Sequence, residues 1–360
     1  MIERYAVIMA GGKGERFWPL STSEHPKQFL ALVGDKPLIA QTMDRLQDLI
    51  PPERIFVITN ADLTDATRAA LPMLPPENVL GEPMGRDTAA AVACAGALIQ
   101  ARNPDAVFCV LPADQVIHQS NLFSSTLQAG MDLANAEDVL VTIGIQPTFP
   151  SSGFGYIEAG ETLPSKSDVA FWKARRFVEK PDTETAEKYL DSGRFYWNAG
   201  MFIWSVSALH RAFSAHCPPM ADLMDALTVY AQKNQLEEGM NVLYPALEKI
   251  SVDYALMEKA DNIVMACGEF DWDDVGAWPA LENHFPADED GNIQMGLMES
   301  VDAHGNITYS PDRLIALIGV DDLMVVQVEG VTLVCPKSRA QDIKKMVIKL
   351  REKGGFEHLL

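Results

Sequence analysis

Residues 5–10 read YAVIMA, and residues 11–17 follow directly as GGKGERF. Residues 5–10 are apolar throughout, which is typical of a strand buried on both faces of a parallel sheet. The glycines then allow a tight main-chain path and close approach of a ligand, while Arg16 and, further on, Lys27 add positive charge. The stretch therefore has two interpretations: a basic structural turn, or a loop whose main-chain N–H groups hold the phosphates of a nucleotide.

The same strand-then-helix rhythm continues through the first 145 residues. Apolar strand patterns alternate with helical patterns in this order: 5–10 (strand), 37–46 (helix), 54–59 (strand), 61–71 (helix), 77–83 (strand), 87–102 (helix), 106–114 (strand), 122–134 (helix) and 139–145 (strand). This alternation predicts an α/β fold with a doubly wound, mixed, mainly parallel sheet of Rossmann-like type. Such sheets bind ligands beyond the carboxyl ends of their strands, and three segments fall at such ends: AGGKGER (10–16), GEPMGRDT (81–88) and LPAD (111–114).

The pattern changes twice along the rest of the chain. Residues 150–285 mix strands and helices and are expected to complete the same sheet. A run of turn-forming residues, PADEDGNI at 286–293, then marks a candidate boundary. We expect residues 1–286 to form one large domain and residues 287–360 a small β-rich, β-helix-like C-terminal domain that ends in a helix.

Composition excludes several classes of protein. The formal net charge of −21 argues against binding to nucleic acid or to an anionic membrane surface, so a site for an anionic ligand must be basic locally. The first residues lack the apolar core of a signal peptide, and no run of about 18 apolar residues predicts a membrane span. Five cysteines without a C-x-x-C pair favour reduced thiols, so a cytoplasmic protein is expected.

The glycine-rich loop does not match the common nucleotide motifs. Phe17 stands where the dinucleotide pattern G-x-G-x-x-G needs its third glycine, which disfavours a nicotinamide-dependent dehydrogenase. The Walker pattern also fails, and the chain has neither a G-x-S-x-G elbow nor an H-E-x-x-H zinc motif.

Several separate motifs carry a resemblance to one family, and they occur in family order. They are AGGKGERFWPLS (10–21), GEPMGRDTAAA (81–91), LPADQVI (111–117), FVEKP (177–181), WNAGMFIW (197–204), SVDYALMEKA (251–260) and FDWDDVGAW (270–278). The chain resembles the sugar-nucleotide pyrophosphorylases, and within them the mannose-1-phosphate guanylyltransferases. This resemblance implies a nucleotidyltransferase fold and the reaction of GTP with mannose 1-phosphate to give GDP-mannose and pyrophosphate, with magnesium and a homodimer.

The resemblance also implies roles for charged residues. Arg16 and Lys27 would take the triphosphate and the leaving pyrophosphate, Asp114 and Asp274 would hold magnesium, and Lys180 would bind the phosphate of mannose 1-phosphate. Each residue also has a simpler interpretation from sequence alone. Arg16 and Lys27 could be exposed cations of a loop, and Asp114 could be a turn residue after a strand. Asp273 or Asp274 could cap a helix, and Lys180 could be a solvated lysine.

Other residues would contact the substrates directly. The implied nucleotide contacts are Ala10, Gly11, Gly12, Gly14, Glu82, Arg86, Asp87 and Thr88. The implied sugar-phosphate contacts are Gly155, Glu158, Glu179, Lys180 and Asn198. A carboxylate such as Glu82 suits guanine because it can accept from both N1–H and the N2 amino group, although a solvated loop acid is the alternative.

Two other functions remain open from the sequence. One is a related transferase that joins UTP or dTTP to another hexose 1-phosphate. The other is a non-catalytic relative, against which the presence of Arg16, Lys27, Asp114, Lys180 and Asp274 argues.

Overall fold

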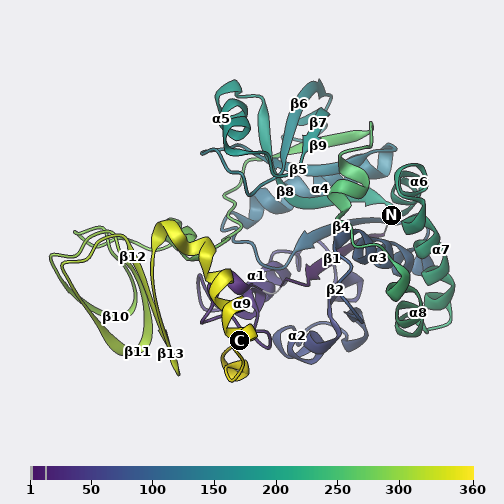
Figure 1. Cartoon of the computed structure of the whole chain (residues 1–360). Helices are drawn as coiled ribbons and strands as arrows, with labels where there is room; N and C mark the ends of the chain where they lie inside the picture. The colour runs from purple at the N-terminus through teal and green to yellow at the C-terminus, as the bar shows by residue number, and fades with distance from the viewer. Residues whose placement is uncertain (1–2, 13) are drawn as a thin grey trace. The chain divides into compact units, whose positions relative to one another are not determined.

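The computed structural model describes residues 3–12 and 14–360, and the chain divides into two compact units (Figure 1). The first unit comprises the residues up to Gly11, Thr42–Ala113 and Ile117–Trp272. The second comprises Gly12–Gln41, Asp114–Val116 and Asp273–Leu360. Both units are discontinuous in sequence, and the predicted boundary between 286 and 287 stays a prediction.

The first unit is built around the apolar strand that precedes the glycine-rich loop. This strand, β1 (Arg4–Ala10), pairs in parallel with β2 (Ile55–Asn60) on one side and with β4 (Val107–Pro112) on the other. Strand β3 (Val79–Glu82) extends the parallel part beyond β2. Val7, which pairs with Phe56 and Val110, is fully buried because helices cover both faces of the sheet at this point.

Five further strands complete this sheet: β5 (Leu140–Ile145), β6 (Tyr156–Leu163), β7 (Phe171–Val178), β8 (Phe195–Ser205) and β9 (Ile263–Gly268). Within the described residues the sheet has nine strands in the order β3-β2-β1-β4-β8-β5-β9-β7-β6. Only β7 and β8 run against the common direction of these nine strands. The predicted mixed, mainly parallel sheet is therefore confirmed.

Helices pack on both faces of the sheet, as a doubly wound fold requires. One face carries α3 (Thr88–Arg102), α6 (Val206–His216), α7 (Pro218–Gln232) and α8 (Leu236–Leu243), whose apolar residues share a core with Phe202 and Trp204 of β8. The other face carries α4 (Ser120–Ala136), and a Cβ added at Gly130 there would collide with Ile203. Three shorter α-helices also occur in this part of the chain: α1 (Leu38–Asp44), α2 (Thr64–Ala70) and α5 (Thr183–Ser192).

The second unit contains the glycine-rich loop from Gly12 onward and the C-terminal strands. Its strands β10 (Ile293–Val301), β11 (Ile307–Ile318), β12 (Leu323–Val328) and β13 (Val331–Pro336) precede α9 (Ile343–Lys353). Strands β10, β11 and β12 pair in parallel, as successive coils do. The coils are joined at Asn292 and Asn306, where the Asn306 side chain donates to Asn292 Oδ1 over 2.9 Å and accepts from Leu323 N over 2.9 Å. The β-helix-like prediction is confirmed.

The aromatic residues that follow the loop belong to the core of this unit. Phe17 is 1% exposed and its ring lies 5.4 Å from that of Trp278, centroid to centroid. Trp18 is also buried, and its Nε1 donates to the carbonyl of Leu359. Among the described residues, no helix is long and apolar enough to cross a membrane.

Candidate active site

The loop after β1 has a backbone shape that only glycine adopts easily at residue 14. Gly14 has φ 59° and ψ 21°, in the left-handed region, and it precedes the short helix η1 (Glu15–Phe17). A Cβ at this position would lie 2.5 Å from the Cβ of Lys27 and 2.6 Å from its main-chain nitrogen. The carbonyl of Gly14 accepts hydrogen bonds from Phe17 N and from the Ser21 hydroxyl. The third glycine of the loop is thus needed so that Lys27 can pack against it.

Lys27 is held almost completely inside the second unit. Its side chain is 8% exposed, and its Nζ donates to Asp114 Oδ2 over 2.8 Å and to the main-chain oxygen of Asp274 over 2.5 Å. The loops that carry these acceptors are joined by an isolated bridge, in which Val116 and Asp273 exchange hydrogen bonds of 2.9 and 3.1 Å. The structure therefore brings Gly14, Lys27, Asp114 and Asp274 together, and we call these four residues the loop cluster.

The two neighbouring aspartates at 273 and 274 have different surroundings. Asp273 accepts hydrogen bonds from Val275 N, Asn283 and the His284 ring. Burial would raise the pKa of Asp273, but these hydrogen bonds outweigh it and hold the pKa below its usual range. Asp273 therefore fixes the turn.

Asp274 belongs to the loop cluster instead. Burial raises its pKa to about 6, against the attraction of Lys27, and the neighbouring charges of Asp273 and Asp114 add to the rise. Arg16, which is exposed, lies near enough to lower that pKa slightly.

The donors of the loop cluster fit a divalent cation of the magnesium type. Asp114 and Asp274 supply hard carboxylate oxygens, and magnesium usually takes one or two carboxylates and keeps water and phosphate as its other ligands. Within the part of the chain that the structure describes, no group of three or more His, Cys, Asp or Glu residues could hold a metal. Burial is the main reason why the pKa of Asp274 is raised, and the charges of Asp273 and Asp114 add to it, so a cation bound here would favour the ionised carboxylate.

A second cluster lies in the first unit, after β7. Lys180 has φ 47°, and its Nζ donates to Glu179 Oε1 over 2.6 Å. The Lys180 side chain is 61% exposed, whereas that of Glu179 is only 9% exposed. Partial burial would lower the pKa of Lys180, but Glu179 and Asp253 outweigh it and raise the pKa. A Cβ at Gly155 would collide with the Glu179 carboxylate, so glycine there makes room for the acid.

Asn198 on β8 connects this cluster to a residue that the sequence analysis did not single out. Its Nδ2 donates to Asp253 Oδ1 over 3.2 Å, and its Oδ1 accepts from the Thr142 hydroxyl and from Gly200 N. Burial, with the nearby charge of Glu179, raises the pKa of Asp253 to about 7. We call Gly155, Glu179, Lys180, Asn198 and Asp253 the second cluster.

One signal could have pointed to Asp253. It lies in SVDYALMEKA, one of the segments that carry the family resemblance, and it opens a π-helical turn, Asp253–Met257. Single π-helical turns are frequent at functional sites.

Glu158, the remaining predicted sugar contact, lies on β6. Its side chain is 15% exposed and forms an ion pair of 3.5 Å with Arg176.

Glu82, at the end of β3, is buried rather than solvated. It is 7% exposed, and its Oε1 has no hydrogen-bond partner among the described residues. Burial, with the charge of Asp87, raises its pKa to about 7. A buried carboxylate oxygen without a partner is costly, so it is a candidate acceptor for a ligand donor. The guanine contact itself stays a prediction.

The residues after Glu82 order the loop that leads into α3. Arg86 donates through Nε to the Tyr244 carbonyl and through Nη2 to the Pro245 carbonyl, each over 2.8 Å. Asp87, with φ 64°, caps α3 by accepting from Thr88 N. The contacts of these side chains are therefore internal, and their nucleotide contacts stay predictions.

Comparison with known proteins identifies the family. The family model for nucleotidyl transferases matches residues 5–291, and that for a MannoseP isomerase/GMP-like beta-helix domain matches residues 298–350. A mannose-1-phosphate guanylyltransferase from Escherichia coli K12 is 34% identical over 371 residues, which cover 98% of this chain and 75% of the relative. The chain belongs to the mannose-1-phosphate guanylyltransferases. A relative of the same name from Klebsiella pneumoniae is 36% identical, also over 98% of this chain and 75% of its own length.

A solved structure agrees with this membership in the guanylyltransferase family. The crystal structure described as mannose-1-phosphate geranyltransferase from Thermus thermophilus is 34% identical to the chain. It superposes with a TM-score of 0.84 over 97% of this chain and all of the other. The family and enzyme class inferred from the sequence motifs are thus confirmed.

Proposed function

We propose that this guanylyltransferase family member transfers GMP from GTP to mannose 1-phosphate in one direct displacement, with magnesium as the metal. The relatives named for this activity span nearly the whole chain. The single observation that carries the mechanistic part is the loop cluster, in which a buried lysine is fixed between Asp114 and the main chain of Asp274.

The reaction needs positioning more than acid–base chemistry. A phosphate monoester has a second pKa of about 6, so mannose 1-phosphate is already ionised at neutral pH and needs no general base. One of its phosphate oxygens bonds to the α-phosphorus of GTP, and the bond from that phosphorus to the bridging oxygen of the β-phosphate breaks. Pyrophosphate leaves with the electron pair. The barrier is charge repulsion, which cations and fixed N–H donors lower.

The loop cluster would bind the phosphates of GTP. Main-chain N–H groups of Gly11, Gly12 and Gly14, following Ala10, would approach the phosphate oxygens closely because no side chain intervenes. Arg16 would add a planar donor pair, and Lys27 a fixed point charge beside the departing pyrophosphate.

Asp114 and Asp274 would hold the metal. Nucleotidyltransferases of this family generally use a divalent metal ion. When bound, magnesium supplies a positive charge that neutralises the phosphate oxygens. Lys27 keeps the Asp114 carboxylate and the Asp274 main chain in place, so neither ligand has to be ordered when the metal binds.

The second cluster would bind mannose 1-phosphate. Lys180 is exposed and attached to one partner, so it can turn to a phosphate. Glu179 and Asn198, with Glu158, would hydrogen-bond the sugar hydroxyls, and Gly155 would leave its main chain accessible. Asp253 would orient the Asn198 amide, because it accepts from Nδ2 and leaves Oδ1 facing Gly200 N.

The loop from Glu82 to Thr88 would bind guanine. The carboxylate of Glu82, whose Oε1 lacks a partner among the described residues, would accept from guanine N1–H and N2–H₂. Arg86, Asp87 and Thr88 would shape the pocket for the base through their internal contacts. The second candidate, a transferase for UTP or dTTP, has no particular observation in its favour.

The resemblance also implies a cytoplasmic homodimer. Exposed apolar side chains on the C-terminal strands suit a contact between copies; they are Leu297, Val301, Leu314, Ile318 and Val334. Light scattering on the purified chain gives the mass of the particle, and a monomer at micromolar concentration would contradict the homodimer.

Pyrophosphate release across a grid of nucleotides and sugar phosphates tests the reaction. GTP with mannose 1-phosphate is expected to give the highest kcat/KM. Faster turnover with UTP or dTTP would overturn the base assignment, and no turnover with any pair would favour the non-catalytic alternative.

A further inference from the structure

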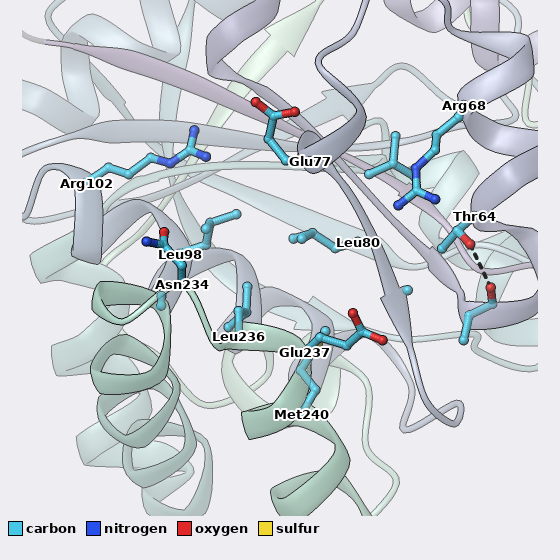
Figure 2. A pocket seen from close by; sticks show the side chains of 14 residues that line it. Thr64, Arg68, Glu77, Leu80, Leu98, Arg102, Asn234, Leu236, Glu237 and Met240 are labelled. Atoms are coloured by element: carbon cyan, nitrogen blue, oxygen red, sulfur yellow. Dashed lines mark hydrogen bonds between the residues drawn. The ribbon is translucent and has the colours of Figure 1, made fainter.

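The first unit contains a cavity of about 490 Å³ beside the edge strand β3 (Figure 2). Its walls come from β3, from Thr64 and Arg68 of α2, from Leu98 and Arg102 of α3, and from residues 231–240 around the start of α8. None of the residues to which the sequence analysis gave a role lines it. Small-molecule sites usually measure about 300–1,000 Å³, so this cavity can hold a metabolite of nucleotide size.

The lining combines three kinds of chemistry. Leu80, Leu98, Leu236 and Met240 form an apolar surface. The charged and polar residues around them are Arg68, Arg102, Glu77, Glu237, Asn234 and Thr64. Figure 2 shows Arg68 and Arg102 on opposite sides of the cavity, with Leu80 between them.

Both arginines keep donors available. Arg68 donates through Nε to the Pro76 carbonyl and through Nη1 to Asp65. The guanidinium of Arg102 lies 4.5 Å from the centre of the Phe56 ring, and only its Nη1 donates, over 3.5 Å to Glu53 O. Among the described residues, Nη2 of Arg68 and the Nε and Nη2 of Arg102 have no acceptor, so an anion can bind them.

The combination selects a class of ligand. Inorganic phosphate would bind the arginines but would leave the apolar surface uncovered. A fatty acid would cover that surface but has no hydrogen-bond donor for the carboxylates of Glu77 and Glu237. A nucleoside phosphate offers an anion for the arginines, an aromatic base for the leucines and Met240, and hydroxyl or amino donors for the glutamates.

Two lining elements lead directly to the loop predicted to bind guanine. Leu80 and Gly81 line the cavity, and the next residue of β3 is Glu82. Gly81 is packed so closely on α2 and its lead-in that an added Cβ would lie 2.7 Å from Thr64 Cγ2. A ligand that shifts Thr64 or Leu80 therefore also shifts the strand end.

The second connection runs through α8. Its residues Leu236 and Met240 line the cavity, and Met240 accepts a 3.4 Å hydrogen bond from the Cys94 thiol of α3. The residues directly after α8, Tyr244 and Pro245, are those whose carbonyls bind Arg86. A shift of α8 would therefore reach the loop through these two hydrogen bonds of 2.8 Å.

We propose that this cavity is a second, regulatory binding site for a nucleoside phosphate, and that its occupation changes the affinity of the Glu82–Thr88 loop for GTP. The effect on GTP rests on the proposed function, whereas the binding site does not. Coupling between two sites is reciprocal, so GTP changes the affinity of the second ligand by the same factor.

Titration calorimetry on the full chain with AMP as the probe tests the site. Orthophosphate and adenosine, measured separately, show whether the anion and the base are both required. The variants Arg68→Gln and Arg102→Gln each remove one guanidinium from the cavity, and Arg211→Gln, whose guanidinium binds Asp138, is the matched control. The variant Lys27→Gln shows whether AMP binds at the loop cluster and not in the cavity, because only binding at the loop cluster would be weakened by it. Thermal melts confirm that each variant is folded.

We expect AMP to bind the wild type, and to bind each cavity variant about tenfold more weakly, because each loses a charge-assisted hydrogen bond. Arg211→Gln and Lys27→Gln should bind AMP as the wild type does. Saturating AMP should change the dissociation constant of GTP by about fivefold or more. No AMP binding, or binding weakened only by Lys27→Gln, would overturn the site. Normal AMP binding with an unchanged GTP affinity would overturn the regulation alone, and absent turnover would affect only the proposed function.

Discussion

The loop cluster and the second cluster each pair a lysine with an acid, but they hold that lysine in opposite ways. Lys27 is 8% exposed and has two acceptors on different loops, whereas Lys180 is 61% exposed and is bound by the adjacent Glu179. A lysine locked at two points is pre-organised, so it stabilises charge without moving. A lysine held at one point can exchange its partner for a ligand. We therefore expect the loop cluster to act on the reaction step and the second cluster to act on substrate binding.

The largest expected effect is at Asp114. Asp114→Asn removes one carboxylate from the proposed metal site and the charged acceptor of Lys27, so kcat should fall by about 100-fold or more. Steady-state pyrophosphate release over a magnesium titration measures this. The exposed Asp222→Asn of α7 is the control. Normal magnesium-dependent activity in Asp114→Asn would show that the loop cluster is structural.

The second effect concerns Lys180. Lys180→Ala should raise KM for mannose 1-phosphate about tenfold, with a smaller change in kcat, because a phosphate loses its cation at the binding step. Lys188→Ala is a close control, since Lys188 is 69% exposed and also donates to a glutamate over 2.6 Å. A fall in kcat without a change in KM would mean that Lys180, like Lys27, acts on the reaction step. The expected difference between the two clusters would then be wrong.

A third change tests the packing of Gly14 on Lys27. Gly14→Ala adds left-handed strain of about 1 kcal/mol and a collision with Lys27, so the free energy of unfolding should fall by about 2–4 kcal/mol. Gly319 has φ 61°, against 59° for Gly14, but no atom within 4 Å of an added Cβ. Gly319→Ala should therefore show the strain alone. Equal losses in chemical denaturation would mean that Lys27 moves aside at no cost.

The smallest expected effect is a pH dependence at Asp253. Its pKa is about 7 in the folded chain and about 3.9 when unfolded. Between these values the folded state keeps a proton that the unfolded state has lost, so this residue makes stability fall as pH rises from about 4 to 7.

Asp253→Asn, which keeps an acceptor for Asn198, should remove that contribution. Relative to the wild type, the free energy of unfolding of the variant should therefore increase by about 1–3 kcal/mol as the pH rises from about 5 to about 8. Denaturant melts at both pH values measure the difference. Parallel pH curves would mean that Lys180 already keeps the carboxylate ionised.

The sequence predicted those parts that depend on local pattern. The β1 strand, its glycine-rich loop and the alternation that follows led to the sheet, and the family motifs led to Lys27, Asp114 and Asp274, which the structure brings together. The pairing of Asn198 with Asp253 joins residues 55 positions apart, and it depends on how a π-helical turn packs against β8. Periodicity and turn signals contain no information on such contacts.

The burial of Glu82 is a second feature that the local sequence pattern does not predict. A Gly-Glu-Pro stretch has the composition of an exposed turn, so a solvated acid is a reasonable alternative from sequence alone. The side chain is buried because it ends an edge strand that packs against helices from much later in the chain. Arg86 likewise meets carbonyls 158 and 159 positions away.

The discontinuity of the second unit has a consequence for biosynthesis. Lys27 and the Asp274 carbonyl that it bonds are 247 positions apart. At translation rates of about 5–20 residues per second, the ribosome adds that acceptor about 10–50 s after the lysine. The glycine-rich loop is therefore one of the first segments to emerge and one of the last to reach its final shape. A nascent chain that stops before residue 273 carries the glycine-rich loop and Asp114, but it lacks Asp274, the second acceptor of Lys27, and Trp278, on which Phe17 packs.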